Sequence, residues 1–190
     1  MLQQADLIVF DSSNSTNNHQ QKEENDQLVR NLGFSNVTIY RYNPPPGIDK
    51  TNKEIVKQTG AKMAMVQPFQ NQSSSWFHGY DWVLRVNPDV LFRRDEWLLH
   101  TMQHNDTVDA IIVPVWGVMN TDFFAFRPTK INGAALVHHY RVTNRNRDRA
   151  ESLIMPGFHH LIQMQRVAEL PHAHSRRLRL QGGINCDVIH

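Results

Sequence analysis

The sequence contains a single cysteine, Cys186, so it can form no internal disulfide and offers no paired-cysteine zinc motif. No run approaches the roughly 18 apolar residues of a membrane-spanning helix. The first residues lack the basic and apolar regions of a signal peptide. The net charge is only +2 over 190 residues. We therefore expect no nucleic acid as the main partner, and a membrane only through a segment absent from this chain.

Several loops that carry well-known chemistry are also missing. The sequence has no Gly-x-x-x-x-Gly-Lys-Ser/Thr loop, no Gly-x-Ser-x-Gly elbow and no Gly-x-Gly-x-x-Gly fingerprint. These absences argue against P-loop hydrolysis, α/β-hydrolase chemistry and dinucleotide oxidoreduction. Sequons for N-glycosylation are present at Asn14, Asn36, Asn71 and Asn105. They favour a secretory lumen such as the Golgi over the cytoplasm.

Segments with the apolar pattern of strands alternate along the chain with segments that have the apolar spacing of helices. Short runs such as 5–11, 37–42, 81–86, 109–115 and 123–126 predict strands, with a last short strand at 188–189. Helical spacing is found over 23–32, 51–66, 95–104, 129–140 and 151–165. The alternation predicts one α/β domain over residues 1–190 with a mostly parallel central sheet. Ligands of such sheets bind beyond the carboxyl ends of strands, where Asp11 and Asp89 fall.

The segment Tyr80 to Phe92 contains the triplet Asn87-Pro88-Asp89 directly after a predicted strand. An oxygen ligand, one spacer and a carboxylate can present two side chains to a hard cation such as Mg²⁺ or Mn²⁺. The same triplet is also typical of a simple turn. Spacing alone leaves both interpretations open.

This segment resembles the region around the Asp-x-Asp motif of GT-A glycosyltransferases, with Asn87 in place of the first Asp and Asp89 matching the second. Met119 to Pro128 is similar to the strand that borders the sugar pocket in glycogenin-like transferases. Asn120 stands at the position of that strand's asparagine, and Asp122 stands where a small glycine is usual. The ending Gly182 to His190 is similar to the late strand that delivers a His to the metal or diphosphate.

The resemblance implies a GT-A-like three-layer sandwich that is truncated at one or both ends. It implies a metal-dependent hexosyl- or pentosyltransferase that moves a sugar from a nucleoside diphosphate donor to a hydroxyl of a glycan or glycoprotein, with Mn²⁺ or Mg²⁺. Asp122 is the expected catalytic residue, as acceptor base or as a ligand of donor hydroxyls. The expected metal ligands are Asn87, Asp89 and His190; the expected donor-binding residues are these three with Asp11, Arg85 and Asn120. A nucleotidyltransferase and a catalytically degenerate GT-A-like binding domain stay open as alternatives.

Overall fold

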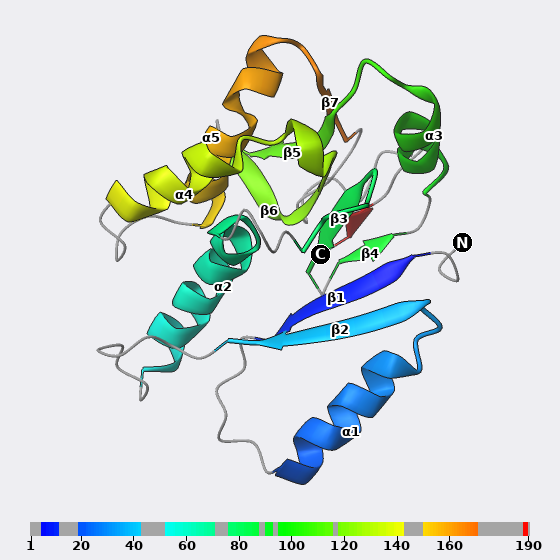
Figure 1. The fold of residues 1–190 in the computed structure, drawn as a ribbon, viewed down its shortest axis with the longest axis vertical. Helices are drawn as coiled ribbons and strands as arrows, with labels where there is room; N and C mark the ends of the chain where they lie inside the picture. The colour runs from blue at the N-terminus through cyan, green and yellow to red at the C-terminus, as the bar shows by residue number, and fades with distance from the viewer. Residues whose placement is uncertain are drawn as a thin grey trace. The chain divides into compact units, whose positions relative to one another are not determined.

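The computed structural model describes residues 5–11, 19–42, 52–70, 76–87, 90–92, 95–115, 118–142, 150–170 and 188–189. The chain divides into two compact units, Met1–Met65 and Val66–His190. Helices and strands alternate through both, as Figure 1 shows, and the predicted α/β class is confirmed. The prediction of a single domain stays a prediction. None of the described helices is long and apolar enough to cross a membrane.

The first unit contains a parallel strand pair. Strand β1 (Asp6–Asp11) pairs with β2 (Asn36–Arg41) residue for residue, so that Asp11 lies opposite Arg41. Helix α1 (His19–Arg30) connects the two strands, and an ion pair between Arg41 and Asp26 ties it to β2. The chain leaves α1 through Gly33, whose φ of +84° suits glycine. Helix α2 (Lys53–Gln70) begins in this unit and continues without a break at Gly60, where the sequence suggested one.

The second unit is built on a four-stranded sheet in the order β3-β6-β5-β7. These strands are β3 (Val83–Val86), β6 (Val118–Phe126), β5 (Ala110–Val115) and β7 (Val167–Glu169). Strand β6 is antiparallel to both β3 and β5, while β7 is parallel to β5. Three strands therefore point the same way and β6 runs against them. Because this sheet is mixed, the expected mostly parallel sheet is not confirmed.

Helices cover both faces of this sheet. Successive residues of a strand point to opposite faces. On one face, Phe123 and Ala125 of β6 pack in a core cluster with Leu98 of α3 (Glu96–His104). On the other face, the rings of Phe124 and Phe126 lie 5.7 and 6.0 Å from that of Phe158. Phe158 belongs to α5 (Ala150–Gln163), which packs beside α4 (Gly133–Val142).

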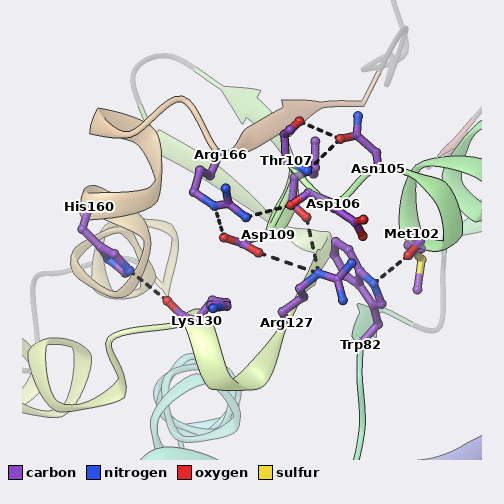
Figure 2. A network of polar contacts seen from close by, with 11 residues as sticks. Trp82, Met102, Asn105, Asp106, Thr107, Asp109, Arg127, Lys130, His160 and Arg166 are labelled. Atoms are coloured by element: carbon purple, nitrogen blue, oxygen red, sulfur yellow. Dashed lines mark hydrogen bonds and ion pairs between the residues drawn. The ribbon is translucent and has the colours of Figure 1, made fainter.

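One edge of the sheet is fixed by a buried carboxylate. Asp109, just before β5, is 2 % exposed and forms an ion pair with Arg166, just before β7. Arg127, just after β6, places its Nε 3.7 Å from the other Asp109 oxygen. The Arg127 guanidinium also lies 4.7 Å from the ring centre of Trp82, just before β3. Figure 2 shows that this network joins residues next to all four strands. We call it the Asp109 clamp.

Two short strands were absent from the sequence prediction. Strand β7 has three residues, and β4 (Leu91–Phe92) has two and pairs antiparallel with β8 (Val188–Ile189). Strand β6 also begins five residues before the predicted 123–126 segment. A run of two or three residues has too little periodicity to be recognised.

The Asp109 clamp makes a prediction about stability and pH. The hydrogen bond from Arg166, helped by the charges of Arg166, Lys130 and Arg127, holds the pKa of Asp109 below its usual range against the opposing effect of burial. Asp109→Asn should lower the free energy of unfolding by about 1–3 kcal/mol at pH 7, less than for a fully buried pair because Arg166 is 31 % exposed.

A lowered pKa stabilises the fold above the pKa of the unfolded aspartate, about 3.9, and this contribution is lost as the pH falls through the folded-state value. Urea unfolding should therefore show a difference between wild type and variant that is full at neutral pH and shrinks below about pH 4. Asp106→Asn is the control, because Asp106 is exposed and meets Arg166 through its backbone carbonyl. Equal stability of wild type and Asp109→Asn at pH 7 would contradict this account.

Candidate functional site

The candidate site lies at the edge of the sheet opposite the Asp109 clamp. There β3 ends, and the chain of β6 passes beside it in the antiparallel register Val86↔Phe123 and Arg85↔Phe124. One step further along the same ladder, the backbone N–H of Asn87 donates to the carbonyl of Asp122 over 2.8 Å. The register therefore sets Asn87 directly opposite Asp122. Opposite residues of an antiparallel pair point to the same face.

The side chains of these two residues meet. The Asn87 Nδ2 group donates a hydrogen bond to Oδ1 of Asp122, and both residues are half-buried. A hydrogen bond to a carboxylate is stronger than one between neutral groups. Because the amide uses its nitrogen toward Asp122, its oxygen can still accept a hydroxyl or ligate a cation. Two residues predicted separately as site residues are thus brought together.

Asn120 supports Asp122 from the same strand. Its Oδ1 accepts the backbone N–H of Asp122 over 2.7 Å. The pairing of β6 with β5 is irregular here, since Ile112 pairs with Phe124 but Pro114 pairs with Met119. Irregularities of this kind leave backbone groups outside the ladder and redirect side chains. The Asn120 side chain accepts the Asp122 N–H, while the Asn87 carbonyl on the facing strand accepts the N–H of Val90.

Arg85 brings a positive charge to the same face. It lies two residues before Asn87 on β3, and its partner Phe124 lies two residues after Asp122 on β6. Arg85 and Asp122 are therefore diagonal neighbours, a separation that a long side chain can span. The Arg85 guanidinium lies 5.9 Å from the centre of the Phe124 ring. The site thus combines a carboxylate, two amides and a guanidinium.

Asp89 and His190 fall outside the described residues, but their neighbours are placed. The backbone N–H of Val90 donates to the Asn87 carbonyl over 3.1 Å, the i to i+3 bond that is typical of a turn. The Val90 side chain packs against the core cluster. Ile189 pairs with Leu91 in the β8–β4 ladder. Ile189, which precedes His190, is therefore paired with Leu91, which lies two residues after Asp89.

The other expected donor-binding residue, Asp11, belongs to the first unit. It is the last residue of β1, as predicted, and its carbonyl accepts the N–H of Tyr42 over 2.9 Å. It is not among the residues that the β3–β6 ladder brings together.

The oxygen atoms at the site in the second unit are of the type that binds a hard cation. A carboxylate and an amide oxygen are the ligands that Mg²⁺ and Mn²⁺ prefer. Among the described residues, no three His, Cys, Asp or Glu side chains are grouped closely enough to hold a metal ion. Such cations commonly take one or two protein carboxylates and complete their shell with water and substrate phosphates.

Sequence reasoning missed three features of this unit. The bond between Asn87 and Asp122 joins residues 35 positions apart, and the bond between Arg166 and Asp109 joins residues 57 positions apart. No local pattern encodes either one. The spacing of His100 and His104 on one helix was a visible signal that the prediction did not use.

The comparisons with known proteins give no further assignment. No family model, no curated protein and no solved structure matches this chain. Function therefore has to be argued from the residues themselves.

The contact between Asn87 and Asp122 can be tested without any substrate. In a double-mutant cycle with Asn87→Ala and Asp122→Ala, we expect a coupling of about 1–2 kcal/mol in the free energy of unfolding, because each single change removes the same charged hydrogen bond. Urea unfolding measures it. Asn87→Ala combined with Asp106→Asn, at the opposite edge, should be additive within about 0.5 kcal/mol. Additivity for Asn87 and Asp122 as well would show that the two side chains do not interact.

Proposed function

We propose that this chain is a GT-A-type glycosyltransferase domain that moves a sugar from a nucleoside diphosphate donor to a hydroxyl of a glycan or glycoprotein. The observation that carries the proposal is the contact between Asn87 and Asp122. These residues come from the two segments that resemble the acidic motif and the sugar-pocket strand of that family, and the β3–β6 ladder joins them. A chance resemblance of two segments gives no reason for them to meet.

The architecture of the second unit supports the same proposal. Helices lie on both faces of its sheet, and β3, β5 and β7 point the same way. The site lies beyond the carboxyl end of β3, where ligands of α/β sheets bind. The pairing of β8 with β4 also brings the end of the chain to the segment that follows Asp89. We propose a GT-A-like three-layer sandwich.

The two departures from the family pattern fall on residues that contact each other, which supports the proposal. Asn87 lacks the charge of the aspartate that it replaces, and Asp122 has a charge where a glycine is usual. Since Asn87 and Asp122 are hydrogen-bonded to each other, this strand end has a negative charge directly opposite Asn87. Two aspartates here would repel each other, so the Asn–Asp pair is also the stable combination.

In the proposed site, Asn87, which is hydrogen-bonded to Asp122, would hold Mn²⁺ or Mg²⁺ together with Asp89 and His190. A cation bound by these residues would supply the positive charge that neutralises a leaving diphosphate. Arg85 adds a second positive charge on that face. The acceptor oxygen forms a bond to the anomeric carbon while the bond from that carbon to the diphosphate oxygen breaks. Asp122, oriented by Asn87 and Asn120, positions the donor sugar or, in an inverting enzyme, accepts the acceptor proton.

One rival function has an observation in its favour. The Asn87 nitrogen is engaged by Asp122, which is also what a purely structural strand-end contact would look like. A catalytically degenerate domain that binds a glycan or a nucleotide without transfer would keep this geometry. A nucleotidyltransferase differs in its product, since it releases pyrophosphate from a nucleoside triphosphate. Product analysis separates the three.

The test is a transfer assay with a panel of uridine and guanosine diphosphate sugars and Mn²⁺, in which release of the diphosphate is measured. We expect turnover of at least one donor, and a loss of about a hundredfold or more in Asp122→Asn, because that change removes the carboxylate and keeps its size. Asp106→Asn, exposed and at the opposite edge, is the matched control and should keep the wild-type rate.

Thermal unfolding of each variant separates lost chemistry from lost folding. Full activity of a folded Asp122→Asn protein would refute the assigned role. Nucleotide binding without release of diphosphate from any donor would favour the degenerate domain instead.

A further inference from the structure

We infer that His100 and His104 on α3 form a second metal site, selective for a divalent transition ion such as Zn²⁺ or Ni²⁺. Both side chains are exposed. They lie four residues apart, one helical turn, so they share a face of the helix. Their rings are stacked, with centres 4.9 Å apart and planes inclined by 18°. This inference does not depend on the proposed glycosyl transfer.

Two imidazoles one turn apart are a recurring way of binding zinc on a helix. Metal–nitrogen bonds are about 2.0–2.1 Å long, so one ion can bridge two neighbouring rings after small rotations of the side chains. Imidazole favours Zn²⁺, Cu²⁺ and Ni²⁺ over Mg²⁺ and Ca²⁺. The ligand type therefore separates this site from the oxygen-rich site at Asn87 and Asp122.

Helix α3 is anchored to the sheet on the side away from the pair. Leu98, on the opposite side of the helix, is buried and belongs to the core cluster of the sheet, and Thr101 is also buried. Because α3 is anchored by that face, His100 and His104 are presented to solvent with a fixed backbone. Such preorganisation reduces the cost of binding.

The other described histidine pairs lack this geometry. His138 and His139 are consecutive on α4, and His159 and His160 are consecutive on α5, so each pair diverges around its helix. His160 also uses its Nε2 in a 2.8 Å contact with the Lys130 carbonyl, drawn in Figure 2. The described residues contain no group of three potential ligands, so we expect water to complete the shell of an ion at His100 and His104. The affinity should then be modest.

The experiment is isothermal titration of the whole chain with NiCl₂. We expect a binding event that weakens by about tenfold or more in His100→Ala and in His104→Ala, since each leaves a single imidazole. His138→Ala, which removes an exposed histidine from α4, is the matched control and should bind as wild type does. Titration with MgCl₂ should give no binding heat that differs between the wild type and His100→Ala.

A second readout ties binding to this helix. Ni²⁺ should raise the melting temperature of the wild type, because an ion that binds only the folded pair stabilises it. The double variant His100→Ala, His104→Ala should lack this shift. Unchanged Ni²⁺ affinity in either single variant, or absence of Ni²⁺ binding in the wild type, would overturn the inference. A failed transfer assay would leave it unaffected.

Discussion

The antiparallel ladder between β3 and β6 is the constraint on which the candidate site depends. Four residue pairs, from Val83↔Phe126 to Val86↔Phe123, set the register. Because side chains alternate along a strand, a slip of one residue would turn either Asn87 or Asp122 to the opposite face. The hydrophobic pattern of β6 prevents such a slip, since Phe123 faces one core and Phe124 and Phe126 face the other. The position of a polar contact is thus determined by the burial of apolar rings.

The two edges of this sheet have different physical characters. At the edge where β3, β5 and β7 begin, Asp109 is enclosed by Arg166 and Arg127, so its charge is matched by partners from the protein. At the edge where these strands end, the half-buried Asp122 meets an amide, with Arg85 as its diagonal neighbour on the same face. The first arrangement joins strand ends and stabilises the fold. The second leaves polar groups where ligands of α/β sheets bind, which is why we place function there.

The sequence predicted most of the elements and most of the candidate residues, but not their contacts. Strands with several apolar or β-branched residues, such as β1 and β5, and helices such as α3 were found close to their true bounds. Strands β4 and β7 were missed because two or three residues show no period, and β7 depends on its parallel partner β5. The resemblance to GT-A glycosyltransferases indicated Asn87 and Asp122 as site residues from two separate segments. Their pairing follows from a register that exists only once the sheet has formed.

The most direct test of the account is Mn²⁺-dependent binding of uridine or guanosine diphosphate, measured by calorimetry in wild type, Asp122→Asn and the exchanged double variant Asn87→Asp, Asp122→Asn. If the negative charge at this strand edge matters and its exact position across the β3–β6 pair does not, Asp122→Asn should weaken binding by about tenfold or more and the exchange should restore it. Binding that is equally strong in all three proteins, or that is insensitive to Mn²⁺, would contradict a cation and diphosphate site at Asn87 and Asp122.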